Sequence, residues 1–111
     1  MDITITQHQT IAEVTLTGRF DAFNADKLRE QLYSIIDQGT NQFVLDLSQT
    51  PFLDSAAMAV LVSLLKRARQ QGGDVKLVWP QQEAARRILN LTRFDRVFSM
   101  SETATAALQT F

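Results

Sequence analysis

Short runs of apolar and β-branched residues alternate with amphipathic helical segments along this chain, which limits its possible folds more than any other feature. The first two runs are separated only by the polar residues His8-Gln9-Thr10, which predicts a β-hairpin. Later runs are separated by segments whose apolar residues recur every three or four positions. A hairpin followed by alternating helices and strands predicts an α/β fold with a mixed sheet. We expect strands at 3–7, 12–17, 43–47 and 75–79, and a brief extended stretch at 97–98.

Helices are expected between these strands. Asn24 is suited to the N-cap of the first, because its side-chain oxygen can accept an early amide, and Gly39 to the left-handed residue after it. Pro51 interrupts the chain before a second helix at 55–70. Gly72-Gly73 follows that helix and predicts a turn into the next strand.

Two further helices are expected toward the end of the chain. Pro80 opens a short one. Ser99 and Glu102 have the Ser-x-x-Glu spacing of a capping box, in which each side chain bonds a free amide at the helix start. The spacing therefore predicts that the last helix begins there.

The 111 residues suffice for one compact domain, and no repeat or linker divides residues 1–111. The hydrophobic share of 45% predicts a real core. A net charge of −1, with acids and bases mixed, lacks the basic stripe of a nucleic-acid binder. No apolar run approaches the ~20 residues of a membrane helix, and the N-terminus lacks a secretory pattern. We expect a cytoplasmic monomer that contacts neither nucleic acid nor membrane.

Side chains with catalytic chemistry are scarce. The chain has no cysteine, which excludes a thiolate nucleophile and a zinc–sulfur site. The one histidine, His8, falls in the predicted hairpin turn and is interpreted as a solvent-facing loop residue. Asp46, Asp54 and Asp95 lie far apart without metal-ligand spacing. We therefore expect no enzyme, no metal site and no cofactor.

The start of the second predicted helix differs from the rest of the chain. The simplest interpretation of Asp54-Ser55 is that one of the two caps the helix. However, Ala56, Ala59 and Ser63 form a smooth surface away from the core, where lysines and glutamates usually dominate. Such a surface can receive a partner closely. A hydroxyl at a helix start is also a natural place for a phosphate, because free amides and the helix dipole stabilise its charge.

Several short motifs occur along the chain in a particular order: Leu16–Asp21, Val44–Ser48, Phe52–Ala59, Gly72-Gly73 and Leu89–Phe94. In this order they resemble the STAS domain, the family of anti-sigma factor antagonists and of cytoplasmic domains of sulphate transporters. The third motif is similar to the family's Asp-Ser-Ser/Thr-Gly-Leu/Met-Gly sequence. The resemblance covers essentially the whole chain. It implies a mixed sheet of four to five strands with a leading β-hairpin and about four α-helices.

The resemblance also implies a function. In this family the serine after the aspartate is phosphorylated by the anti-sigma factor, a serine kinase of the histidine-kinase-like ATPase type, and a serine phosphatase restores it. The unphosphorylated antagonist binds the kinase and frees the sigma factor or another output protein. Ser55 is the matching serine, and Asp21 matches an acidic residue that lies beside the phosphorylated helix. We expect the partner to contact Asp21, Asp54, Ala56, Ala59 and Ser63.

The chain departs from the family pattern at three positions. Ala57 and Ala59 stand where glycines are common, and Arg19 stands where acidic or neutral residues are familiar. We expect these residues to alter partner specificity. The alternative function is an accessory STAS subunit of a transporter or lipid-trafficking complex, in which Ser55 only caps its helix. The presence of both Asp54 and Ser55 favours the partner-switching regulator.

Overall fold

Five strands form one mixed sheet in the order β1-β2-β3-β4-β5 in the computed structural model, which describes all of residues 1–111. The first two strands pair antiparallel, and every later strand runs parallel to its neighbour. This confirms the predicted mixed sheet with a leading hairpin. The strands are β1 (Asp2–His8), β2 (Ile11–Thr17), β3 (Gln42–Gln49), β4 (Asp74–Val78) and β5 (Ser99–Ser101).

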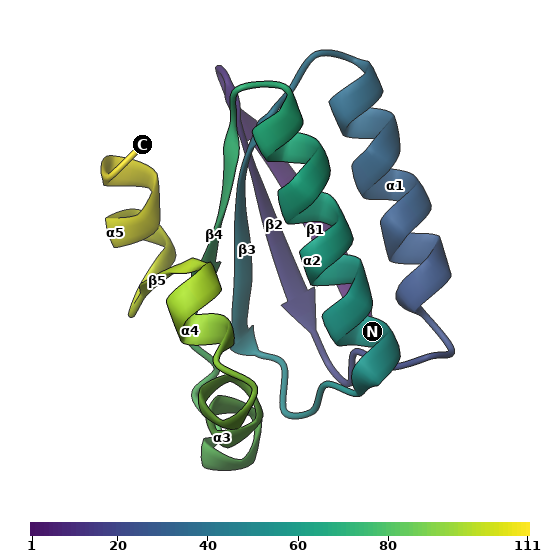
Figure 1. The fold of residues 1–111 in the computed structure, drawn as a ribbon, viewed down its shortest axis with the longest axis vertical. Coiled ribbons are helices and arrows are strands. Elements are labelled where there is room, and N and C mark those ends of the chain that lie inside the picture. The colour runs from purple at the N-terminus through teal and green to yellow at the C-terminus, as the bar shows by residue number, and fades with distance from the viewer.

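Helices cover both faces of the sheet. Figure 1 shows two long helices side by side on one face and the C-terminal helix on the other. The two remaining helices lie together near the lower end of the sheet. The helices are α1 (Ala25–Asp37), α2 (Ser55–Gln70), α3 (Glu83–Leu91), α4 (Phe94–Val97) and α5 (Ala104–Gln109).

Most of the core lies between the sheet and the pair α1 and α2. A cluster of 24 buried residues fills this space, and alternate residues of β3, among them Phe43 and Leu45, point into it. Val44 points the other way and packs with Val78 and Ala107 beneath α5. Because β3 is covered on both faces, its residues form a nearly continuous apolar run. Burying one such side chain stabilises the fold by about 1.5–3 kcal/mol.

The start of α1 differs from the prediction. Asn24 precedes the helix, but its side chain makes no cap hydrogen bond. Its Oδ1 instead accepts the N–H of Asp21 at 3.0 Å, and its Nδ2 donates to the carbonyl of Arg19 at 2.9 Å. The predicted capping bond is therefore wrong, because this amide stabilises the loop before the helix rather than the helix itself.

The C-terminal part of the chain also differs from the prediction. The predicted extended stretch at 97–98 is displaced, because the short helix α4 runs to Val97 and β5 begins only at Ser99. Ser99 is thus a strand residue and not a helix cap. Thr103 caps α5 instead, accepting the N–H of Ala106 at 3.1 Å. Glu102 forms an ion pair with Arg86 at 3.2 Å.

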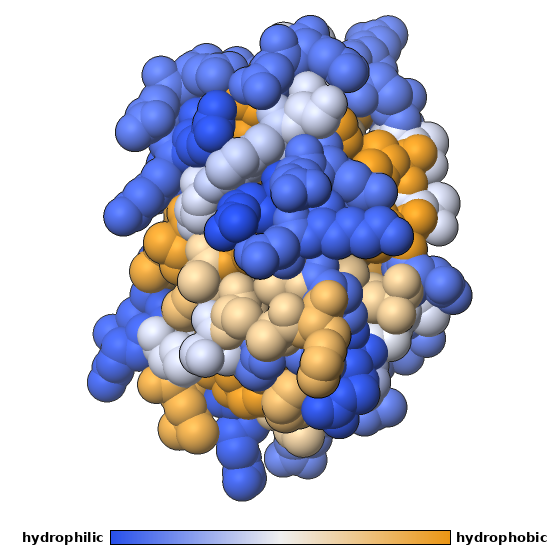
Figure 2. Space-filling view, turned by 90° about the vertical axis from the view of Figure 1, so that its right-hand side faces the viewer, coloured by the Kyte–Doolittle hydropathy of each residue, from blue (hydrophilic) through white to orange (hydrophobic).

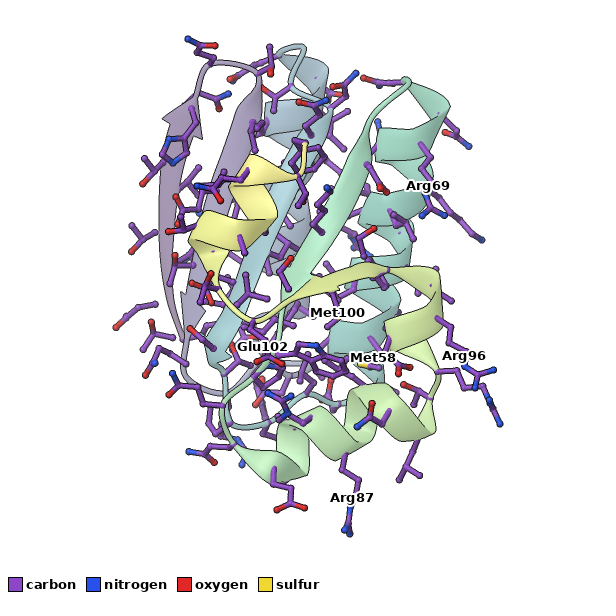
Figure 3. The ribbon with its side chains drawn as sticks, turned by 90° about the vertical axis from the view of Figure 1, so that its left-hand side faces the viewer. Met58, Arg69, Arg87, Arg96, Met100 and Glu102 are labelled. Atoms are coloured by element: carbon purple, nitrogen blue, oxygen red, sulfur yellow. The ribbon has the colours of Figure 1, made fainter.

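Two polar regions complete the description. His8 lies at the end of β1 rather than in the turn, and its Nε2 lies 2.7 Å from a carboxylate oxygen of Glu13. Figure 3 shows Arg87 and Arg96 pointing away from the body of the molecule.

No helix of the structure combines the length and apolar character that crossing a bilayer requires.

Candidate functional site

The first turn of α2 starts just beyond the carboxyl ends of the parallel strands. Asp54 is its N-cap, with an extended backbone and with Oδ1 accepting the N–H of Ala57 at 2.9 Å. Ser55 is the first residue of the helix and is exposed. Of the two cap candidates that the sequence left open, the structure therefore selects Asp54. Asp54 satisfies the helix amide, so the helix does not need the Ser55 hydroxyl for this bond.

The loop between β2 and α1, formed by residues 19–24, lies against this turn. The N–H of Phe20 donates to the carbonyl of Phe52 at 3.0 Å, and the N–H of Asp54 donates to the carbonyl of Phe20 at 3.3 Å. The N–H of Ala22 donates to Asp54 Oδ2 at 2.9 Å. One carboxylate thus binds both the helix and the loop. This places Asp21, as expected, beside the start of α2.

The carboxylate of Asp54 is ionised at neutral pH. Its pKa lies below the ordinary value of 3.8, mainly because the amide of Ala57 donates to it. Desolvation raises the pKa in opposition, and the amide of Ala22 adds to the lowering. The start of α2 therefore already carries a fixed negative charge next to Ser55.

The small-residue surface of α2 is narrower than the sequence suggested. Ala59 is exposed and Ala56 is half-buried. Ser63, about two turns further along, is also half-buried, and its hydroxyl hydrogen-bonds the hydroxyl of Tyr33 on α1. Ala57 is fully buried in the core. Figure 2 shows the side of the molecule on which α1 lies in Figure 1, where weakly hydrophobic side chains lie mostly below the middle.

The structure gives two residues of this loop, Phe23 and Arg19, positions that the sequence did not predict. Phe23 is 99% exposed, and its N–H donates to Asp21 Oδ1 at 3.0 Å. The guanidinium of Arg19, the residue that departs from the family pattern, lies 4.2 Å from the centre of the Phe52 ring. No signal in the sequence separates Phe23 from Phe20 in the same loop, which is fully buried.

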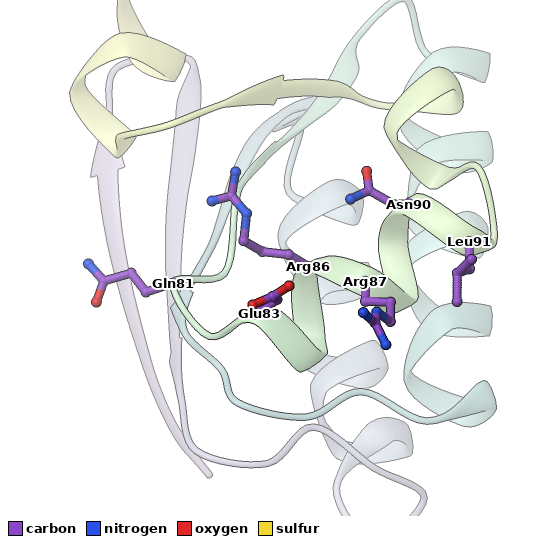
Figure 4. A pocket seen from close by; sticks show the side chains of 6 residues that line it. All are labelled: Gln81, Glu83, Arg86, Arg87, Asn90 and Leu91. Carbon is purple, nitrogen blue, oxygen red and sulfur yellow. The ribbon is translucent and has the colours of Figure 1, made fainter.

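A shallow hollow lies elsewhere, over α3 (Figure 4). Arg86 in its wall donates to the carbonyl of Pro80 and pairs with Glu102. The hollow contains none of the predicted site residues, and the structure holds no group of three acids or histidines placed to bind a metal ion. The hollow is lined by Gln81, Glu83, Arg86, Arg87, Asn90 and Leu91.

The fold agrees with a comparison against known families. The model of the STAS domain matches residues 2–107. The chain belongs to the STAS domain family. This confirms the resemblance that the motifs carried.

Relatives and structural neighbours of this STAS domain include anti-sigma factor antagonists. The anti-sigma-B factor antagonist of Bacillus subtilis is 29% identical over 77 residues, which is 69% of this chain and 70% of that protein. A crystal structure of the Thermotoga maritima protein TM1081 has a TM-score of 0.91 at 25% identity, covering 97% of this chain and 92% of that one.

The fold is also that of Bacillus SpoIIAA, an anti-sigma factor antagonist. Its unphosphorylated form superposes with a TM-score of 0.79 at 14% identity, over 98% of this chain and 96% of that one. SpoIIAA has been solved in a phosphorylated form as well. At 14% identity this likeness to SpoIIAA shows the fold.

Proposed function

We propose that this STAS domain is an anti-sigma factor antagonist that binds its anti-sigma factor while Ser55 is unphosphorylated and leaves it once Ser55 is phosphorylated. One observation carries the proposal: the Ser55 hydroxyl is exposed at the first residue of α2, while its neighbour Asp54 performs the capping. A modification of Ser55 therefore leaves the cap intact. The relatives named as anti-sigma factor antagonists support the same function.

The chemical step is a phosphoryl transfer from ATP. Ser55 Oγ attacks the γ-phosphorus, the bond from that phosphorus to the bridging oxygen breaks, and ADP leaves while the hydroxyl proton goes to the kinase or to solvent. The structure offers the nucleophile alone, so the partner supplies ATP and the catalytic groups. Hydrolysis of the phosphoserine by a serine phosphatase returns the hydroxyl.

Charge accounts for release. A seryl phosphate adds about −1.5 to −2 charge at neutral pH. It would lie beside the ionised carboxylate of Asp54 and close to Asp21, which makes one compact anionic cluster. A partner that covers this surface would have to desolvate the cluster, which opposes binding strongly unless cations pair with it. Because Asp54 keeps its bonds to helix and loop, we expect the interior to change little.

The partners follow from this assignment. They are an anti-sigma factor serine kinase of the histidine-kinase-like ATPase type and a serine phosphatase. The domain acts as a cytoplasmic monomer without a cofactor, and is not an enzyme itself. Its contact surface consists of the first turn of α2 and the adjoining loop, with the engaged hydroxyl of Ser63 at its far edge. The residues of this surface are Asp21, Asp54, Ser55, Ala56, Ala59 and Ser63.

Phosphate incorporation tests the proposal. Purified domain is incubated with ATP and each kinase of this type from the same genome, and the modified residue is identified by mass spectrometry. Ser55→Ala should abolish incorporation, whereas Ser34→Ala, which removes an exposed serine on α1 outside the contact surface, should retain it. Incorporation that persists in Ser55→Ala would refute the site. A wild-type domain that binds such a kinase but is never modified would favour an accessory role in a transporter or lipid-trafficking complex.

A further inference from the structure

Phe23 is the most exposed large hydrophobic residue of the chain. Its relative exposure of 99% exceeds that of Leu91 at 75%, Val97 at 46% and Ile5 at 40%. Single apolar residues on a surface are common and need no function. Aromatic side chains, however, are enriched among the few residues that dominate binding energy at protein interfaces. Phe23 therefore requires a second observation before a function can be assigned to it.

The backbone on both sides of Phe23 is held in place. Its own N–H donates to Asp21 Oδ1 at 3.0 Å, and the preceding N–H, of Ala22, donates to Asp54 Oδ2 at 2.9 Å. The following residue, Asn24, donates its N–H to the carbonyl of Asp21 at 3.1 Å and its side-chain amide to the carbonyl of Arg19. A ring on a backbone that is already ordered loses less conformational entropy when it binds.

The same hydrogen bonds join Phe23 to the phosphorylation site. Ala22, directly before Phe23, bonds the carboxylate of Asp54, which is directly before Ser55. The ring and the hydroxyl therefore belong to one continuous surface, although 32 residues separate the two bonded positions in sequence. A protein that covers Ser55 closely also meets Phe23.

We propose that Phe23 is the aromatic anchor with which this domain binds its anti-sigma factor, by filling an apolar pocket with a basic rim on that protein. The inference rests on the proposed function. The basic rim follows from charge, since Asp21 lies in the loop, Asp54 binds its backbone and Asp26 is exposed just beyond it. Arg19 lies 3.8 Å from Asp21 and Arg29 lies 3.0 Å from Asp26, so the three carboxylates outnumber the two guanidinium groups that pair with them. Phe23 would set the affinity of the complex, and the charge on phosphorylated Ser55 would release the complex.

The carboxylates around Phe23 argue against other occupants. In a two-fold dimer the same patch meets itself, so the Asp21 and Asp54 of two copies would face one another. An anionic lipid surface would be repelled by the same groups. A protein with cations around an apolar pocket suits both the ring and its charged surroundings.

Affinity measurements on the unphosphorylated domain test the anchor. Phe23→Ala should raise the Kd for the anti-sigma factor by about tenfold or more, since truncating a central aromatic typically has at least this effect. Phe23→Leu should recover part of the loss. Leu91→Ala removes another exposed apolar side chain, on α3, and should leave the Kd unchanged. All three variants should keep the wild-type melting temperature, because both side chains are largely solvated.

The outcomes separate the anchor from the switch. A Kd of Phe23→Ala within twofold of wild type, with Ser55 still phosphorylated, would overturn the anchor and leave the proposed function intact. Binding that depends on Phe23 without any phosphorylation of Ser55 would support the anchor and overturn the switch. Failure of the wild-type domain to bind any anti-sigma factor would overturn both. Self-association or binding to anionic vesicles that Phe23→Ala abolishes would assign the ring to another occupant and overturn the proposal.

Discussion

Ser55 and Ser63 lie on the same helix about two turns apart, and their hydroxyls have different surroundings. Ser55 begins α2, where the loop at residues 19–24 bonds the cap residue Asp54, and is exposed. Ser63 lies where α1 packs alongside, and it is half-buried with its hydroxyl bonded to Tyr33. Position on a helix therefore does not decide whether a serine is available for modification. The neighbouring element decides it, because α1 engages the hydroxyl of Ser63 and leaves Ser55 exposed.

The largest effect should come from placing a carboxylate at each serine in turn. Ser55→Glu supplies part of the charge of a phosphate at the exposed position, so it should weaken anti-sigma factor binding by about tenfold or more while folding normally. Ser63→Glu forces a charge between α1 and α2, so it should lower the free energy of unfolding by about 1–3 kcal/mol. Urea denaturation and calorimetric titration measure the two effects.

Either of two results would contradict this contrast between Ser55 and Ser63. Equal destabilisation by Ser55→Glu and Ser63→Glu would mean that the first turn of α2 is packed as tightly as its middle. Unchanged affinity of Ser55→Glu would show that charge at this position does not control binding. Ser55→Gln, which adds the same bulk without charge, serves as the control for size.

A smaller effect should follow from removing one partner of the hydrogen bond between the helices. Tyr33→Phe and Ser63→Ala should each lower the free energy of unfolding by about 1 kcal/mol. The double variant should lose less than the sum of the two, because each single change removes the same bond. The guanidinium of Arg67, 4.2 Å from the Tyr33 ring centre, packs on this ring in all the variants that keep it aromatic.

If the double variant lost the full sum of the two single losses in free energy of unfolding, the hydrogen bond between Tyr33 and Ser63 would be contradicted. Ala59→Ser is the matched control, because it changes an exposed position on the same helix and should alter stability by less than about 0.5 kcal/mol.

The periodicity of apolar residues predicted the helices and strands, because these depend mainly on the local sequence. It located all the long elements, and the predicted bounds of α2 agree with the structure. The same pattern placed Ala59 and Ser63 on one open surface, because periodicity identifies a face of a helix but not the element that covers it. The bond from Ser63 joins residues 30 apart in sequence, and no local signal announces it.

The errors at helix ends have a related cause. Ser, Thr, Asn and Asp all suit an N-cap, and tertiary contacts select among them. Asn24 bonds its own loop, and Ser99 belongs to a strand. At α2 the sequence left Asp54 and Ser55 open as caps, and the amide of Ala22, from a distant part of the chain, also bonds the carboxylate of Asp54. The exposure of Phe23 depends on the same loop geometry.

The smallest effect concerns the pH dependence of the cap. Because the folded pKa of Asp54 lies below its ordinary value of 3.8, its carboxylate stabilises the fold at pH values above 3.8, and this contribution is lost as pH falls through the folded pKa. Asp54→Asn still caps the helix but does not titrate. The melting temperature of wild type should therefore exceed that of Asp54→Asn at neutral pH, and the difference should shrink on acidification.

Asp26→Asn controls for the loss of a carboxylate. Asp26 is exposed, and it pairs with Arg29 at 3.0 Å, both residues lying on α1. A difference between wild type and Asp54→Asn that stays constant down to the lowest pH would mean that the amides of Ala57 and Ala22 do not favour the charged form. The negative charge next to Ser55 would then not be fixed by the fold. Release would have to depend on the phosphate alone, and the distinction between the two serines of α2 would rest on exposure and not on charge.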